Sequence, residues 1–220
     1  MTTSDARDRQ PMSAAALLPL DPDQLLTTTR SVRKRLDLTR PVSVDTIVEC
    51  LDVARQAPSA SNQQSWHWIV VTDRGKKEAI AQYYARSYAA YTADRPKVLS
   101  GSRQRGASSA DHLCQVLGDV PVLVIGAIET GGPLPTGNQA TIWGSLLPAT
   151  WSLCLALRAR GLGSAWTSLH LTFEREIAAL LGIPETVHQG VLLPVAYTKG
   201  TDFRPAAREP LDRSVHVDGW

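Results

Sequence analysis

The 220-residue chain lacks the features of a disulfide framework, a zinc protein or a membrane protein. Its three cysteines, Cys50, Cys114 and Cys154, are far apart and form no CxxC pair, so we expect buried free thiols in a reducing, cytoplasmic compartment. No stretch approaches about 20 apolar residues, and we expect no membrane span. The histidines show no ligand spacing, so we expect no metal site.

The common catalytic and nucleotide-binding signatures are also absent. Gly161 and Gly163 lack the third glycine of a dinucleotide fingerprint, and they follow a predicted helix instead of a strand. The chain has no GxxxxGK[ST], HExxH or GxSxG motif. We therefore predict no catalytic side chain; if the protein is an enzyme, the difficult chemistry implies a cofactor.

The charge balance excludes some partners and leaves one local feature. The composition, 43% hydrophobic and 20% charged, excludes a wholly disordered chain. A net charge of +2 is too weak for general nucleic-acid binding, and the longest basic run has no interleaved aromatic residues. That run places five basic residues within the eleven positions 30–40, which marks either an anion site or a solvated face.

Hydrophobic periodicity predicts one α+β domain over residues 21–220, preceded by a flexible arm over residues 1–20. Helices are predicted over 43–56, 76–91, 107–117, 138–160 and 173–181, strands over 66–71, 121–126, 163–169 and 187–197, and a loop over 93–105. The helix over 138–160 carries so wide an apolar surface that we expect it to be central. The tail, residues 199–220, has no periodicity but keeps several large apolar residues, so we expect it to dock on another surface.

Four short segments occur in a diagnostic order. They are 29–35 (TRSVRKR), 57–66 (APSASNQQSW), 159–167 (ARGLGSAWT) and 208–212 (REPLD). Each is weak alone, but the ordered set resembles the FMN-dependent nitroreductase family over residues 25–220. The resemblance implies a three-layer α+β fold with a central mixed or antiparallel sheet flanked by helices. It also implies a homodimer with the long helix at its interface and the tail wrapped around the partner.

The resemblance implies that FMN lies in two equivalent sites built from both subunits. Arg30, Ser31, Arg33 and Arg208 would hold the phosphate and ribityl chain, because guanidinium groups supply charge-assisted donors to a phosphate. Arg33 could also place a cation near the flavin pyrimidine edge. The alternatives are a solvated basic helix start for Arg30 and Arg33, and a surface salt bridge for Arg208.

Two further segments would touch the flavin ring by the same resemblance. The small-residue loop consists of Pro58, Ser59, Ala60, Ser61 and Asn62 and would belong to the other subunit's site; the second segment, which would face flavin N5, consists of Trp166, Thr167, Ser168 and Leu169. The alternative for the loop is a helix C-cap turn, which Pro and Ser would explain alone, and Trp166 could equally be plain core.

The chain departs from the family pattern at several positions. Thr29 stands where a second arginine is frequent, and Gln64-Ser65 replaces the usual Gln-Pro before the tryptophan. An asparagine often found in the central helix is absent near Trp151, and Arg35 stands where phenylalanine is frequent. The first of these departures removes one expected phosphate contact.

The resemblance implies an NAD(P)H oxidoreductase with ping-pong kinetics. NADPH or NADH would deliver hydride to flavin N5 and leave, and a small electron-poor aromatic, a nitroaromatic or quinone, would be reduced at the same face. Alternatives on the same scaffold are destruction of the flavin to make a cobamide ligand, reductive dehalogenation, or sequestration of FMN without catalysis.

Overall fold

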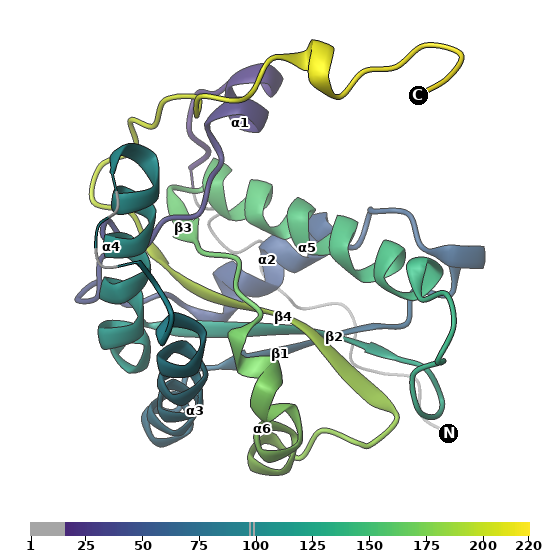
Figure 1. Cartoon of the computed structure of the whole chain (residues 1–220). Coiled ribbons are helices and arrows are strands. Elements are labelled where there is room, and N and C mark those ends of the chain that lie inside the picture. The colour runs from purple at the N-terminus through teal and green to yellow at the C-terminus, as the bar shows by residue number, and fades with distance from the viewer. Residues whose placement is uncertain (1–15, 97, 99) are drawn as a thin grey trace.

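The computed structural model describes residues 16–96, 98 and 100–220. Its centre is one four-stranded sheet in the order β1-β2-β4-β3, with every neighbouring pair antiparallel (Figure 1). The strands are β1 (Trp66–Val71), β2 (Val122–Glu129), β3 (Leu162–Ser164) and β4 (Val187–Tyr197). The predicted α+β class and three-layer arrangement are confirmed, and the sheet is antiparallel.

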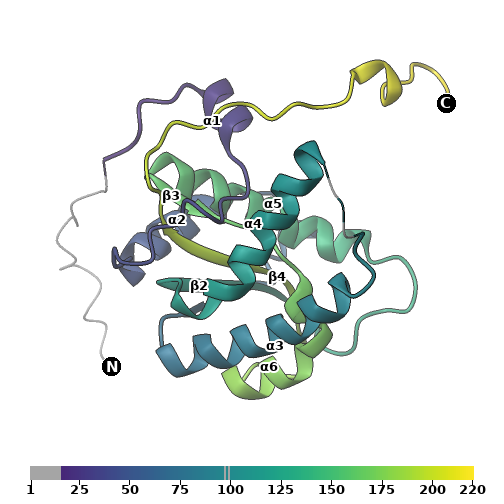
Figure 2. The same cartoon turned by 60° about the vertical axis from the view of Figure 1, so that its left-hand side comes forward.

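Helices cover both faces of the sheet, as Figures 1 and 2 show. On one face lie α2 (Val44–Ala54) and α5 (Ala140–Ala159); on the other lie α3 (Arg74–Thr92), α4 (Gly101–Val116) and α6 (Glu174–Leu181). The short α1 (Pro22–Thr28) lies near the end of α5. Ser43 caps α2, as the sequence predicts, by accepting a hydrogen bond from the Thr46 amide.

The central strands are buried on both faces because their side chains alternate between two cores. In β2, Val122 and Val124 pack with α2 and α5, while Leu123 and Ile125 pack with α3, α4 and α6. Two of the three free cysteines are buried as expected, and Cys114 is half-buried. The continuous apolar runs that predicted β2 and β4 therefore reflect a sheet covered on both sides.

Helix α5 confirms the predicted central helix and lies close to β4. A Cβ atom at Gly190 of β4 would lie 2.6 Å from the Leu146 side chain, so glycine permits this approach. By length and composition α5 could also cross a membrane, which the sequence argument did not anticipate. Core helices can have the same length and apolar composition, and 44% of the most apolar stretch of α5 is buried in the protein. The length and composition of α5 are therefore weak evidence for a membrane span.

Two predicted boundaries were wrong. Helix α4 begins at Gly101, inside the predicted loop over 93–105, because its polar first half (GSRQRG) carries no apolar periodicity. The predicted strand over 163–169 ends at Ser164 and is followed by a 3-10 helix, Leu169–Phe173. The ladder is interrupted where Ala165 meets Pro194 of β4, since proline has no N–H to donate, and pairing returns only as an isolated bridge between Thr167 and Leu192.

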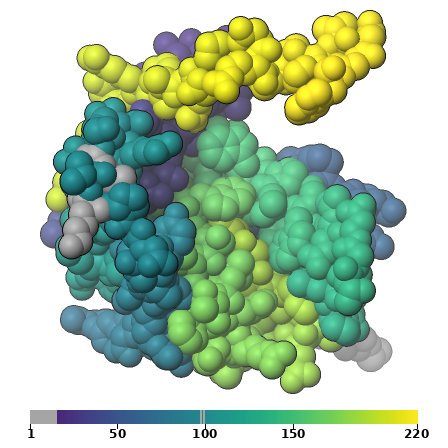
Figure 3. Space-filling view, viewed as in Figure 1, coloured from purple at the N-terminus to yellow at the C-terminus, as the bar shows by residue number. Residues whose placement is uncertain are grey.

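The first described residues lie against the end of α5, whereas the C-terminal tail extends away from the body of the protein. Residues 1–15 of the predicted arm lie outside the described residues, and the Leu18 amide donates to the Ala159 carbonyl at the end of α5. The tail runs past α1 and projects from the body with open space beneath its end (Figure 3). Leu211, Val217 and Trp220 in it are fully or largely exposed.

Candidate functional site

A pocket of about 1230 Å³ lies between the segment 30–35, helix α4 and the C-terminal residues 202–209. Seven cationic and two acidic side chains line this basic pocket, which leaves a net charge of +5; they are Arg30, Arg33, Lys34, Arg35, Arg105, Arg204 and Arg208, with Asp202 and Glu209. The start and the end of the chain therefore meet at one strongly positive concave surface.

The segment carrying Arg30 and Arg33 is held against the edge strand β3. Ser31 forms a parallel bridge with Ser164, and the Val32 amide donates to the Ser164 carbonyl at 2.8 Å. A Cβ atom at Gly163 would lie 3.0 Å from Cβ of Val32, so glycine is required for this approach. With Val32 buried, the basic side chains on either side of it reach the pocket.

The opposite wall begins with residues 199–204, here called the C-terminal strap. Three arginines donate to its backbone carbonyls. Arg35 donates to Lys199 at 2.9 Å and to Asp202 at 2.8 Å. Arg158 of α5 donates to Thr201, and Arg30 donates to Arg204, each at 2.9 Å. The strap is thus anchored by guanidinium groups from two distant parts of the chain.

One aromatic side chain fastens the strap further. The guanidinium carbons of Arg35 and Arg158 lie 4.1 and 4.9 Å from the ring centroid of Phe203, within the range of a cation–π contact. Arg158 is only 4% exposed, and burial lowers its pKa, with the nearby Arg35 charge acting in the same direction. Within the described residues, its Nε and Nη1 atoms have no hydrogen-bond acceptor.

The remaining arginines of the pocket have no protein acceptor. Across residues 16–96, 98 and 100–220, the side chains of Arg33, Arg105 and Arg208 make no hydrogen bond or ion pair. The nearest acid in sequence, Glu209, lies 3.4 Å from Arg213 instead. Guanidinium groups held together without ion pairs to carboxylates are the donor set that a phosphate needs, so these residues fit the phosphate of FMN.

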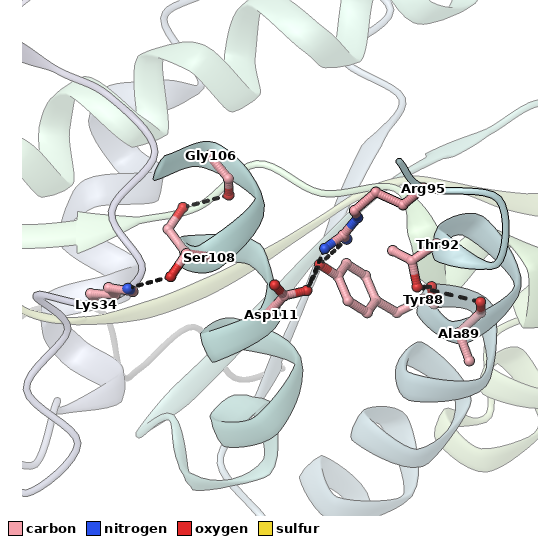
Figure 4. Close-up of polar contacts among 9 residues, drawn as sticks. Lys34, Tyr88, Ala89, Thr92, Arg95, Gly106, Ser108 and Asp111 are labelled. Carbon is pink, nitrogen blue, oxygen red and sulfur yellow. Dashed lines mark hydrogen bonds and ion pairs between the residues drawn. The ribbon is translucent and has the colours of Figure 1, made fainter. Parts of the chain in front are cut away.

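Helix α4 forms the third wall and is tied down on two sides (Figure 4). Lys34 donates to Ser108 Oγ at 2.7 Å. Tyr88 of α3 donates to the Asp111 carboxylate at 2.6 Å, and Arg95 donates to the same oxygen at 2.7 Å. These contacts lower the pKa of Asp111, the Tyr88 hydrogen bond most and Arg95 next.

The predicted segment Trp166, Thr167, Ser168 and Leu169 lies beside the basic pocket without lining it, as far as the structure describes the pocket. Thr167 donates to the hydroxyl of buried Tyr84 at 3.3 Å. Burial raises the pKa of Tyr84, while the Thr167 hydrogen bond and the Arg33 charge oppose that shift. Trp166 packs on the α2–α5 core, Leu169 packs on the opposite core, and Ser168 is exposed.

The predicted loop Pro58, Ser59, Ala60, Ser61 and Asn62 lies elsewhere, near the start of α5. The Ala60 amide donates to Ser145 Oγ at 3.0 Å, beside a second pocket of about 630 Å³. Ser61, Asn62 and Gln64 have φ values of 49°, 54° and 53°. Left-handed backbone at three non-glycine residues costs free energy and is concentrated at functional sites.

A single chain therefore brings together only part of the predicted site. Arg30, Ser31, Arg33 and Arg208 share the basic pocket, whereas the loop contacts the opposite end of α5. A 20-residue helix spans about 30 Å, so most of that length separates the loop from the β3 edge. The loop cannot reach the basic pocket of its own chain.

Sequence reasoning missed several pocket residues. Arg35 is given no site role by the sequence analysis, yet it holds the strap, and Arg105 lies in a segment predicted to be a loop. Arg158 carried the one available signal, since a cation within the apolar helix over 138–160 needs a specific partner. Phe203 was recognised only as an apolar anchor of the tail, and its two arginine neighbours are distant in sequence.

Comparison with protein families gives a match over residues 26–197 to a model described as "Nitroreductase family". A protein of Archaeoglobus fulgidus named "Putative NADH dehydrogenase/NAD(P)H nitroreductase" is 28% identical over 201 residues, covering 90% of this chain and 97% of that protein. The 5,6-dimethylbenzimidazole synthase of Rhodospirillum rubrum is 30% identical over 148 residues, covering 66% of this chain and 67% of that enzyme.

Among solved structures, a variant of an FMN and NADPH-dependent nitroreductase from sphigopyxis sp. strain HMH superposes with a TM-score of 0.67. The superposition covers 91% of this chain and 100% of that chain at 20% identity. At this identity the likeness shows the shared fold.

Proposed function

Because the chain belongs to the nitroreductase family, we propose that it is an FMN-dependent oxidoreductase that uses NAD(P)H to reduce a small electron-poor aromatic. The observation that carries this proposal is the meeting of Arg30, Arg33 and Arg208 in one pocket, with no carboxylate to neutralise Arg33 or Arg208 among the described residues. The names of its relatives agree with redox chemistry, and nitroaromatics or quinones are the acceptor class we propose.

The chain's own residues would bind and orient the cofactor. Arg30, Arg33 and Arg208 would hold the FMN phosphate. The Ser31 hydroxyl would donate a hydrogen bond to the same phosphate or to the ribityl chain. When bound, FMN supplies the hydride-transfer chemistry. Arg33 would also place a positive charge near the ring, and the same charge acts on the buried Tyr84 hydroxyl, which accepts from Thr167. No protein side chain is assigned to the reaction itself.

A second copy of the chain would complete each site. The loop Pro58–Asn62 carries backbone strain without serving the basic pocket of its own chain, which is explained if it contacts the flavin held by a partner. The tail projects from the body with exposed apolar residues, as a segment that wraps a partner would. We therefore propose a homodimer with two shared sites.

The test is the visible spectrum of the purified protein, followed by acid release and identification of the chromophore. The proposal expects a yellow protein that releases FMN and loses its flavin absorbance when NADPH or NADH is added without oxygen. Adding a nitroaromatic or quinone should then restore the absorbance. A colourless protein that also fails to take up added FMN would refute the proposal.

The relative that makes 5,6-dimethylbenzimidazole supports a second candidate, destruction of the flavin itself. This alternative predicts oxygen-dependent loss of FMN during turnover and a benzimidazole product detectable by mass spectrometry. Stable FMN through many cycles of acceptor reduction would exclude it.

A further inference from the structure

The basic pocket carries more positive charge than one FMN phosphate can neutralise. Its net charge is +5, whereas a phosphate monoester carries about −1.5 to −2 near neutral pH. The phosphate would engage Arg30, Arg33 and Arg208, and Arg35 is already committed to the strap. A second group of cations, Lys34, Arg105 and Arg204, remains for another anion.

The second group faces the pocket from three directions. Lys34 comes from the segment beside β3, Arg105 from α4 and Arg204 from the end of the strap. Its one recorded side-chain partner in the described chain is the neutral hydroxyl of Ser108, which accepts from Lys34 at 2.7 Å. In the described chain these cations are therefore in no ion pair with a carboxylate, and the bond from Lys34 to Ser108 is the one hydrogen bond by which their side chains hold part of the fold, helix α4.

Helix α4 is shaped to admit a ligand at this place. The residues that it contributes to the pocket wall, Ser102, Arg105, Gly106 and Ser109, follow helical spacing and share one face. A Cβ atom at Gly106 would meet nothing within 4 Å, so the wall is open there. Arg105 is thus flanked by the hydroxyl groups of Ser102 and Ser109 and by the open space at Gly106, and not by packed side chains.

We propose that Lys34, Arg105 and Arg204 form a second anion subsite, which binds the 2′-phosphate of NADPH and makes the protein prefer NADPH to NADH. This inference rests on the proposed function, because it assumes that the pocket receives a reduced nicotinamide dinucleotide. NADPH and NADH differ only in that phosphate. A dianionic monoester, with three acceptor oxygens, uses several converging cations better than a hydroxyl does.

The test measures binding instead of turnover. Isothermal titration calorimetry compares adenosine 2′,5′-bisphosphate with AMP on the purified protein, with FMN in excess so that the first phosphate subsite stays filled. We expect the bisphosphate to bind about 10- to 100-fold more tightly, the range for charge-assisted hydrogen bonds. The preference should shrink as salt is raised, because the contacts are solvent-accessible.

Matched variants locate the subsite. Lys34→Gln and Arg105→Gln should each lower the affinity for the bisphosphate about 5- to 10-fold and leave the affinity for AMP unchanged. Arg175→Gln removes an exposed arginine from α6, away from the pocket, and should change neither affinity. Thermal unfolding of each variant checks that the fold is retained, which is expected because Lys34, Arg105 and Arg175 are exposed.

The outcomes separate this inference from the proposed function. Equal affinities for the two nucleotides, or equal losses in the Arg105 and Arg175 variants, would overturn the second subsite. A protein that holds FMN and is reduced equally well by NADH and NADPH would retain the proposed function without this subsite. If the protein takes up no FMN, the proposed function fails, and the calorimetric preference for the 2′-phosphate still decides whether the anion subsite exists.

Discussion

Among the described residues, the basic pocket and the protein core both contain side-chain nitrogen atoms without hydrogen-bond acceptors, but the consequences differ. In the pocket, the guanidinium groups of Arg33, Arg105 and Arg208 face an open cavity where water solvates them. In the core, Arg158 and His170 are 4% and 0% exposed, and burial lowers the pKa of both. A guanidinium group that faces an open pocket remains available to bind an anion, whereas a buried nitrogen atom without an acceptor lowers stability.

Arg158 stands between the two regions. It is buried in α5, but one of its nitrogens donates to the strap that forms the pocket wall. The cost of burying this charge is offset in part by the Thr201 carbonyl and the Phe203 ring. The arginines of this region therefore fall into two groups. One group holds the walls of the pocket together, and the other has side chains that remain available to bind a ligand.

The largest expected effect concerns the buried histidine. Burial lowers the pKa of His170 to about 4, whereas an unfolded histidine has a pKa of about 6.5. Between pH 6.5 and pH 4 the unfolded chain binds a proton at this histidine and the folded chain does not. The free energy of unfolding should therefore fall by about 3 kcal/mol as the pH drops from about 6.5 to 4. Urea denaturation across this pH range measures the slope.

The control for this prediction is His170→Leu, which removes the titrating group and fills its buried site with an apolar side chain. The variant should lose most of the stability change between pH 6.5 and 4. An unchanged pH slope in His170→Leu would show that other groups cause it.

The next effect concerns a cation in the open pocket. Arg208→Ala should weaken FMN binding about 10- to 100-fold, equivalent to about 1.5–3 kcal/mol, because it removes a charge-assisted donor. The free energy of unfolding without FMN should hardly change, since the exposed Arg208 side chain makes no hydrogen bond or ion pair in the described chain. Fluorescence titration with FMN and urea denaturation measure the two quantities; lost stability with unchanged FMN affinity would reverse our assignment of Arg208.

A smaller effect is expected at the border between core and pocket. Phe203→Ala removes the ring that contacts Arg35 and Arg158 and should lower the free energy of unfolding by about 1–2 kcal/mol. Phe203→Leu keeps the apolar body and should recover part of this loss. Limited proteolysis with trypsin should cut after Lys199 faster in the alanine variant; equal cutting rates would mean that the ring does not hold the strap.

The smallest effect concerns the strained loop. Asn62→Gly relieves a left-handed backbone and should raise the free energy of unfolding by up to about 1 kcal/mol. We expect FMN affinity to fall nonetheless, because the amide side chain that would contact the flavin is lost. Gln64→Gly relieves similar strain at a residue outside the predicted set and keeps the Asn62 amide, although it removes the hydrogen bond that Gln64 donates to Asn62 Oδ1; it should lower FMN affinity less than Asn62→Gly does. Equal FMN affinities in the two variants would remove Asn62 from the site.

Local patterns predicted most of the fold. The continuous apolar run of β2 and the apolar stripe of α5 identified both elements, because a strand covered on both faces is apolar throughout and a packed helix is apolar at helical spacing. The first half of α4 escaped prediction because its residues face solvent and the pocket. The early end of β3 escaped because it depends on Pro194, a residue of a different strand.

The sequence by itself determined the α+β class, the family resemblance and the arginines that a phosphate site needs, because each is a property of residue type and spacing. Tertiary structure decided which basic residues face the pocket without a protein acceptor and which hold its walls together by hydrogen bonds. Arg35 and Arg105 differ only in what the folded chain places beside them: two strap carbonyls for Arg35 and open space for Arg105. Acceptors supplied by residues more than 160 positions away cannot be recognised from local spacing.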